Sequence, residues 1–138
     1  MDSLIKQKCQ NEFIKILADG AKNTIWEDSN KCKSLGIFAD TIPDVSHAEQ
    51  LVVGMRYVNS KGVAEERTIA VVKAKSIKCK NLAAKIVKYI YALRLDVNYI
   101  VFLSCDFAST MSGWFEGVQT SMSSMLGWKI LYFQCLGH

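Results

Sequence analysis

Two apolar segments that each end in an aspartate constrain the fold of this chain more than any other feature. The first is SLGIFAD, which ends at Asp40, and the second is YIVFLSCD, residues 99–106, which ends at Asp106. Short apolar runs of this kind are typical of buried strands. An aspartate at a strand end has a plain structural interpretation, since it often begins a turn or caps a helix. Two such strands lying side by side would instead bring two carboxylates together.

The N-terminal part of the sequence has a helical pattern. Apolar residues recur at helical spacing over residues 3–32, and Gly20 is expected to break this stretch into two pieces. We therefore divide the chain into an N-terminal helical segment, residues 1–33, and one α/β domain, residues 34–138.

Strand and helix patterns alternate through the rest of the chain. After a polar turn at 41–49, which contains Pro43, we expect strands at 50–58 and 65–74, joined by a turn with Gly62 at positive φ. A helix at 81–94, capped by Asn81, should follow. The pattern then predicts a second helix at 110–126, with Trp114, Val118, Met122 and Met125 on one side, and a last strand at 128–134. This order predicts a five-stranded mixed sheet, an antiparallel hairpin plus parallel strands, covered by helices on at least one face.

Composition excludes several classes of protein. Half of the 138 residues are hydrophobic, which is enough for a packed core. We expect a soluble intracellular protein without membrane contact, because the N-terminus has no signal-peptide pattern and no apolar run approaches the ~20 residues that span a bilayer. The five cysteines are irregularly spaced and predict reduced thiols. We find no glycine loop for nucleotides, nucleophile elbow or cofactor motif, so we expect neither a small-molecule substrate nor a required cofactor.

Three sequence blocks resemble the catalytic domain of hAT-superfamily transposases and their domesticated relatives, including zinc finger MYM-type proteins. The first block, DTIPDVSHAEQLVVGMRYVNSKGVAEER, matches at Asp40, Asp44, Ser46, His47, Gln50, Leu51, Arg56, Tyr57, Val58, Gly62, Glu66 and Arg67. The second, SCDFASTMSGWFEGVQT, matches at Asp106, Ala108, Met111, Ser112, Gly113, Gly117, Val118 and Gln119. The third is the final Cys-x-x-His pair, Cys135 and His138.

The resemblance implies a partial RNase H-like fold in which the first strand lies beside the fourth. Asp40 and Asp106 would then be the metal pair of the ancestral enzyme. RNase H-like nucleases use divalent cations to activate water and stabilise the leaving oxygen of a phosphodiester. We expect these two aspartates to be vestigial ligands that bind Mg²⁺ or Mn²⁺ weakly at most.

Departures from the family pattern argue against activity. Phe107 stands where the family has glycine, and Cys79-Lys80 replaces a Thr-Gly dipeptide. The family's third acidic residue lies on a last helix beyond the final residue of this sequence, so we expect a truncated domain that is not an enzyme. The family's zinc-finger module is also outside this sequence.

Three other groups have competing interpretations. Cys135 and His138 resemble a support for the active-site edge, and two ligands alone do not close a tetrahedral zinc site. His47 is expected to be a turn residue near Asp44 rather than a general base. The lysines at positions 73, 75, 78, 80, 85 and 88 form the densest basic stretch, which is either a solvated surface or a strip that contacts DNA phosphates.

Three functions follow for testing. The first is a non-catalytic, transposon-derived fragment, which is either a decayed transposase remnant or a module that binds a protein partner or self-associates through an uncovered sheet face. The second is a metal-dependent transposase or nuclease domain that uses Asp40 and Asp106 with an acid from elsewhere. The third is a sequence-independent DNA-binding module. The resemblance, and nothing else in the sequence, implies a nuclear location.

Overall fold

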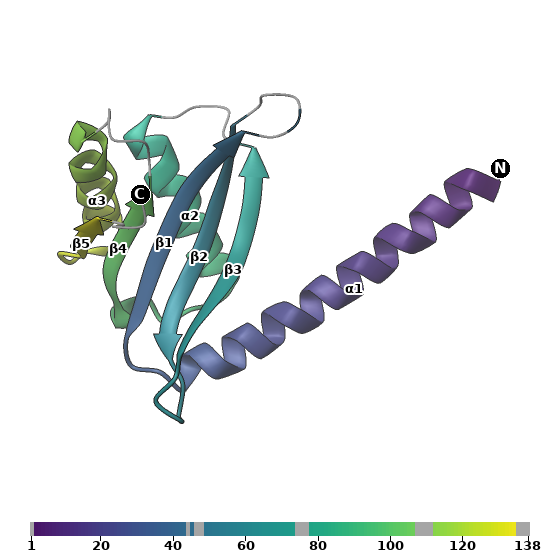
Figure 1. Ribbon diagram of the computed structural model, residues 1–138, viewed down its shortest axis with the longest axis horizontal. Coiled ribbons are helices and arrows are strands. Elements are labelled where there is room, and N and C mark those ends of the chain that lie inside the picture. The colour runs from purple at the N-terminus through teal and green to yellow at the C-terminus, as the bar shows by residue number, and fades with distance from the viewer. Residues whose placement is uncertain (1, 44, 46–48, 74–77, 107–111, 135–138) are drawn as a thin grey trace.

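The computed structural model is an α/β structure with a five-stranded mixed sheet, as the sequence predicts (Figure 1). It describes residues 2–43, 45, 49–73, 78–106 and 112–134. The elements are α1 (Asp2–Asn30), β1 (Leu35–Pro43), β2 (Glu49–Val58), β3 (Ala64–Lys73), α2 (Cys79–Ala92), a short 3-10 helix (Val97–Tyr99), β4 (Ile100–Asp106), α3 (Ser112–Leu126) and β5 (Leu131–Gln134). In the described part of the chain, no helix is long and apolar enough to cross a membrane.

The strand order is β3-β2-β1-β4-β5, which places β1 at the centre of the sheet. The strands β1, β2 and β3 are antiparallel, whereas β4 pairs in parallel with both β1 and β5. The hairpin between β2 and β3 turns at Gly62, whose φ of 77° is the positive value expected there. Asn59 closes this turn because its side-chain oxygen accepts hydrogen bonds from the amides of Lys61 and Val63.

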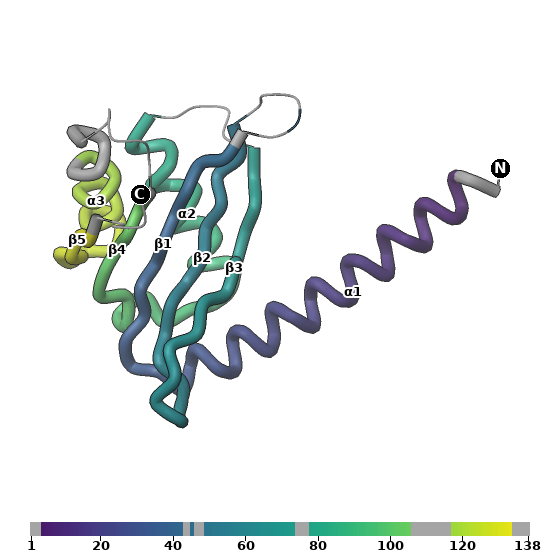
Figure 2. The backbone as a smooth tube through the Cα atoms, viewed as in Figure 1, coloured from purple at the N-terminus to yellow at the C-terminus, as the bar shows by residue number. Residues whose placement is uncertain are grey.

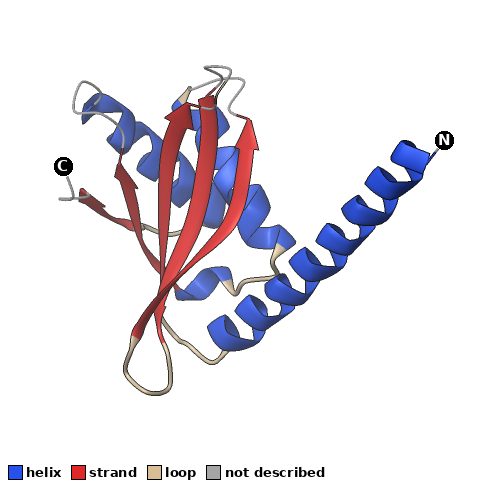
Figure 3. Cartoon of the chain, turned by 45° about the vertical axis from the view of Figure 1, so that its right-hand side comes forward, coloured by secondary structure: helices blue, strands red, loops and turns tan. Residues whose placement is uncertain are grey.

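Helices α2 and α3 lie on the same side of the sheet and bury one of its faces (Figure 3). Alternate residues of β1 and β2 point into this core, and Ile37, Val53 and Met55 are fully buried. The apolar stripe of α2 packs onto them, with Ile86 and Ile90 also fully buried. We call this the covered face of the sheet.

The opposite face of the sheet, which we call the open face, has a different construction. The ring of Phe102 on β4 lies over Gly36 on β1, and the ring of Phe38 on β1 lies over Gly54 on β2, so a Cβ atom at either glycine would collide with a ring. Phe133 on β5 packs edge-on against Phe102, with ring centroids 5.6 Å apart. Glycine has no side chain at these two positions, and aromatic rings from the neighbouring strands occupy the space above them.

The N-terminal helix α1 extends away from the rest of the molecule (Figure 2). It runs without a break through Gly20, so the predicted interruption is wrong. Glycine weakens a helix interior by only about 1 kcal/mol, and Thr24 continues the local bonding by donating a hydrogen bond to the Gly20 carbonyl. Contact with the body is confined to the last turns, where Ser29 and Cys32 are buried and the Cys32 thiol donates to the Val58 carbonyl at 3.1 Å.

Two element boundaries are also predicted wrongly. The strand β1 continues to Pro43, inside the predicted turn, because β4 has already ended beside Asp40 and a residue without an N–H is tolerated there. Helix α2 begins at Cys79, after the N-cap residue Lys78, and Asn81 lies inside its first turn.

The predicted apolar side of α3 is also wrong in part. Val118 and Met122 are buried as expected, but the next buried residue is Leu126, four positions further on. Met125 is 38% exposed because it points away from this row. The last strand, β5, is shorter than predicted and begins at Leu131.

Candidate functional site

The two aspartates that end apolar strands are brought together by the pairing of β1 with β4. In this parallel register Asp40 is the Cα partner of Asp106, at the last paired position of the two strands. The Asp40 side chain is partly exposed, and that of Asp106 lies outside the described side chains. Side chains alternate along β1, so Asp40 is on the open face with Gly36 and Phe38. The predicted juxtaposition of the two residues is therefore present in the backbone.

The residue types at this edge fit a hard divalent cation, since both are carboxylates that offer oxygen ligands. Among the described residues, no group of three or more His, Cys, Asp or Glu gathers as a metal site. The other predicted site residues near this edge, Asp44, His47 and Met111, lie outside the described residues, as do Cys135 and His138. Ser112 and Gly113 form the first turn of α3, where side chains are not described. The metal-binding role of the aspartates stays a prediction.

Cys105 lies between the aspartate edge and the core. It pairs with Ala39 in the β1–β4 register and is 2% exposed. Burial raises the pKa of the Cys105 thiol to about 12, and the negative charge of Asp40 acts in the same direction, while a hydrogen bond with the Ala39 backbone opposes the shift. A thiol that stays protonated is a weak nucleophile and a weak metal ligand. We therefore expect Cys105 to be unreactive.

The matched residues of the first block mainly build the β2–β3 hairpin. Arg56 and Glu66 are directly paired across the two strands and form an ion pair at 3.2 Å on the open face, with both side chains about half exposed. Arg67 forms a second ion pair with Glu65. Tyr57 is 2% exposed on the covered face, and burial is the largest cause that raises its pKa. These positions hold the hairpin in register.

The matched residues of the second block attach α3 to its neighbours. A Cβ atom at Gly117 would lie 2.9 Å from the Cys79 sulfur, so glycine permits the close approach of α3 to the first turn of α2. Val118 is fully buried in the core. The Gln119 side-chain amide donates a hydrogen bond to the Ile130 carbonyl at 2.6 Å, which fixes α3 against the segment before β5.

The basic stretch is only partly gathered by the fold. The Lys85 ammonium donates a hydrogen bond to the Lys73 carbonyl at 2.7 Å, which places the exposed face of α2 beside the end of β3. Lys78, Lys85 and Lys88 are close to one helical face at 100° per residue, and Lys80 lies on another side. Lys75 is outside the described residues.

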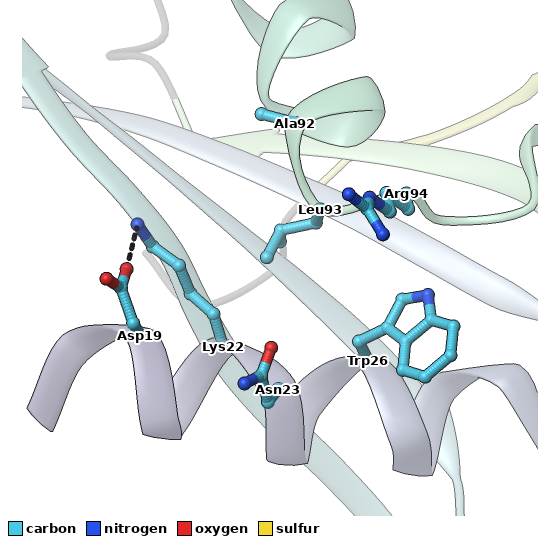
Figure 4. Close-up of a pocket in the computed structure, with 7 residues that line it drawn as sticks. All are labelled: Asp19, Lys22, Asn23, Trp26, Ala92, Leu93 and Arg94. Atoms are coloured by element: carbon cyan, nitrogen blue, oxygen red, sulfur yellow. Dashed lines mark ion pairs between the residues drawn. The ribbon is translucent and has the colours of Figure 1, made fainter. Parts of the chain in front are cut away.

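Two clefts among the described residues are lined by residues other than Asp40. One of about 400 Å³ lies between α1 and the end of α2, with Lys22 and Trp26 on one side and Leu93 and Arg94 on the other (Figure 4). Another, of about 570 Å³, opens on the open face near Gly36, Arg56 and Phe102. Neither is lined by Asp40.

Two features of this surface are not predicted by the sequence. One is the pair of aromatic rings over Gly36 and Gly54, although a glycine within each of two apolar strands is a signal for close approach of another group. The other is that, among the described residues, the C-terminal turns of α1 meet the body while its N-terminal turns are exposed. Periodicity predicts the helix but does not say which layer will cover it.

Comparison with known proteins agrees with the fold. The family described as ZMYM1/FAM200, RNase-like domain (DUF4371) matches residues 2–117, which is most of the chain. No curated protein matched the sequence. The matched range includes α1, the whole β1–β4 pairing and Asp106. The chain therefore belongs to the ZMYM1/FAM200 RNase-like domain family, a group of domesticated, transposase-related domains.

Proposed function

We propose that this chain is a hAT-type transposase descendant that works as a protein-binding module and not as a nuclease. The hAT assignment rests on the three sequence blocks, which occur in the order of that superfamily. The binding role rests on one observation, the apolar character of the open face next to Asp40. Phe133 is 55% exposed, Leu131 53% and Val71 54%, and the rings of Phe38 and Phe102 lie between them on the same face.

This surface is poorly suited to a nuclease. A nuclease holds its polyanionic substrate with positive groups close to the metal ligands. On the open face, Arg56 is already paired with Glu66, and Lys73 lies at the end of the edge strand β3, two strands away from Asp40. Apolar surface of this kind is instead buried by another layer of structure, and a helix is the usual layer on a mixed sheet. The partner we propose is an amphipathic helix of another protein.

The alternative nuclease function uses the same edge of the sheet. Asp40 and Asp106 would hold Mg²⁺ or Mn²⁺, which would supply activation of water and stabilisation of the leaving oxygen. This function needs a further acid from another segment. Under our proposal the metal is held weakly at most and the carboxylates only end their strands.

A cleavage assay separates these functions. Plasmid DNA is incubated with the purified chain and Mn²⁺, with Asp40→Asn as the matched variant. We expect no cleavage above background in either sample. Cleavage by the wild-type chain that is lost in Asp40→Asn would establish the nuclease function and contradict our proposal.

A second experiment tests the partner class. A library of amphipathic helical peptides is selected for binding to the chain, and the affinities of the selected peptides are measured by calorimetry. We expect Phe133→Glu to weaken binding about 30-fold or more, as for a central interface residue. Val63→Glu is the control, because Val63 is also 55% exposed but lies in the β2–β3 turn. Equal effects of the two variants would exclude the open face as the binding surface.

DNA binding by the basic stretch is a second candidate, favoured by the hydrogen bond that brings Lys85 to the end of β3. Binding to duplex DNA should then weaken steeply with salt, and Lys85→Ala together with Lys88→Ala should lower the salt slope by about 2. A slope that is the same in the double variant would assign any DNA binding to other residues. A nuclear location belongs to this proposal as well.

A further inference from the structure

The helix α1 carries apolar side chains that its own molecule does not cover. Phe13 is 70% exposed, Ile16 68%, Leu17 65% and Ile5 56%, although each belongs to a well-formed helix. Single exposed apolar residues are common on protein surfaces, but a cluster along one element marks an interaction surface. The part of the helix before the cleft residue Asp19, from Asp2 to Ala18, is about 26 Å long at 1.5 Å per residue.

These residues form a regular row. Ile5, Cys9, Phe13, Leu17, Ala21 and Ile25 follow one another at a spacing of four, and we call the first four members the outer row. Only the last residue of the series, Ile25, packs against the core. Residues at this spacing form a continuous ridge on a helix surface.

The described part of the chain leaves the outer row uncovered. Lys22 and Trp26 line the cleft between α1 and the end of α2, on the side of the helix that faces the body (Figure 4). At 100° per residue, Phe13 and Leu17 lie about 140° and 180° around the helix from Trp26. The orientation of α1 is fixed at its C-terminal end by buried Ser29 and by the Cys32–Val58 hydrogen bond, which leaves no freedom to turn the outer row inward.

We infer that the outer row of α1 packs against the outer row of α1 in a second copy of this chain. Two ridges of spacing four interdigitate at an angle of about 50°. Ile5, Cys9, Phe13, Ile16 and Leu17 from each copy, at about 100 Å² of apolar surface each, would bury about 1,000 Å². That apolar area, with its polar margin, is close to the ~1,200 Å² of the smaller specific interfaces. The helix therefore carries enough apolar surface for a dimer without any other element.

Charge and shape favour an antiparallel pair. Lysines and acids are interspersed along the helix at Lys6, Lys8, Glu12, Lys15, Asp19 and Lys22, so a second identical helix does not meet a long block of like charge. Each body is attached to the C-terminal end of its helix, so the antiparallel arrangement places the two bodies at opposite ends of the pair. With Phe13 at the crossing point, Cys9 of one copy lies beside Leu17 of the other.

Sedimentation analysis of the 138-residue chain over a range of concentrations tests the pairing. We expect a reversible dimer whose dissociation constant rises about 30-fold or more in Phe13→Glu. The control is Leu4→Glu, because Leu4 is 72% exposed and lies on another side of the same helix, and we expect its effect to stay within about twofold. Circular dichroism confirms that both variants keep equal helix content. A wild-type chain that stays monomeric, or equal effects of the two variants, would overturn the inference.

Two further variants define the interface. In Leu17→Cys, mild oxidation should form a disulfide between Cys9 of one copy and the new cysteine of the other, identified by mass spectrometry. A Cys9–Cys9 bond in the wild-type chain would show a parallel pair and contradict the antiparallel arrangement. Phe133→Glu should leave the dimer intact, and its loss in this variant would assign self-association to the open face instead. Failure of the helix pair thus leaves the peptide and cleavage experiments on the open face unaffected.

Discussion

The two faces of the sheet are built from the same five strands but differ in how they are completed. On the covered face, Ile37, Val53 and Met55 are fully buried under α2 and α3. On the open face, Phe133, Leu131 and Val71 each expose more than half of their surface, and aromatic rings lie over glycines. The alternation of residues along each strand decides which side chains lie on which face of the sheet. A face is buried only where helices or another layer of structure pack on it.

The apolar side chains of the two faces contribute to different free energies, those of folding and of binding. Apolar side chains on the covered face have already lost their water, so their contribution belongs to folding. Those on the open face still contact water and can contribute to association. We therefore expect substitutions on the covered face to change the free energy of unfolding, and equivalent ones on the open face to change it little.

The largest expected difference comes from two isoleucines on the same strand. Ile37 is fully buried on the covered face, and Ile42, on the open face, is 45% exposed. Ile37→Ala should lower the free energy of unfolding by about 2–5 kcal/mol, because it leaves a cavity in the core. Ile42→Ala should lower it by less than about 1 kcal/mol. Urea unfolding followed by circular dichroism measures both values, and equal losses would break the distinction between the faces.

The next effect depends on pH and on Cys105 of the covered face. Burial raises its pKa from 9.0 to about 12, so between these values the unfolded chain releases a proton that the folded chain keeps. Its stabilising contribution is therefore complete below about pH 9 and is lost as pH rises towards about 12, by up to ~1.4 kcal/mol per pH unit.

Cys105→Ala removes this titration. The slope of unfolding free energy against pH above pH 9 should be shallower in the variant than in the wild-type chain, whatever the two values are at neutral pH. Lysines and tyrosines titrate in both proteins and cancel in the difference. Identical slopes would mean that the thiol is accessible to water, and this would place Cys105 outside the sealed core.

A smaller effect is expected at the glycines of the open face. Gly36→Ala places a methyl group where the tip of the Phe102 ring lies, and overpacking of this kind costs about 1–3 kcal/mol. We expect the low end of that range, because the ring can move towards solvent on an uncovered face. A double-mutant cycle with Phe102→Leu measures the coupling, and a cost that persists unchanged with leucine would attribute the strain to the backbone.

The smallest effect is expected for the ion pair on the open face. Arg56 and Glu66 are about half exposed and pair at 3.2 Å. Exposed pairs contribute less than about 1 kcal/mol, and salt screens them. A double-mutant cycle in low and high salt should give a coupling energy that falls with salt. A larger value that resists salt would indicate that the open face is covered in solution, for example by a partner.

Local sequence patterns predicted the elements well where the local signal was complete. The β2–β3 hairpin, Gly62 at positive φ and the existence of a helix at α2 all follow from spacing alone. The end of β1 at Pro43 was not predicted, because it depends on where the neighbouring strand β4 ends. The start of α2 after Lys78 was not predicted either, because it depends on which carbonyl closes the first helical turn. Gly20 was misjudged because one glycine costs less than the helix gains from the residues around it.

The candidate site divides in the same way. The resemblance predicted that the first and fourth strands are neighbours, and the register of Asp40 with Asp106 agrees with this. The roles of these two aspartates remain predictions to be tested by metal titration and cleavage. The apolar surroundings of Asp40 could not be predicted, since they arise from rings on β1, β4 and β5 that are distant in the sequence.

The sequence by itself determined the order of helices and strands, the hairpin turn and the membership of the chain in its family, because each is recorded in residues close together or in ordered motifs. The tertiary structure alone decided which apolar residues are covered. Ile37 and Phe13 are equally hydrophobic in the sequence, yet one is fully buried and the other is 70% exposed. Burial depends on which other segment is present at the same place, and a periodic pattern carries no information about that segment.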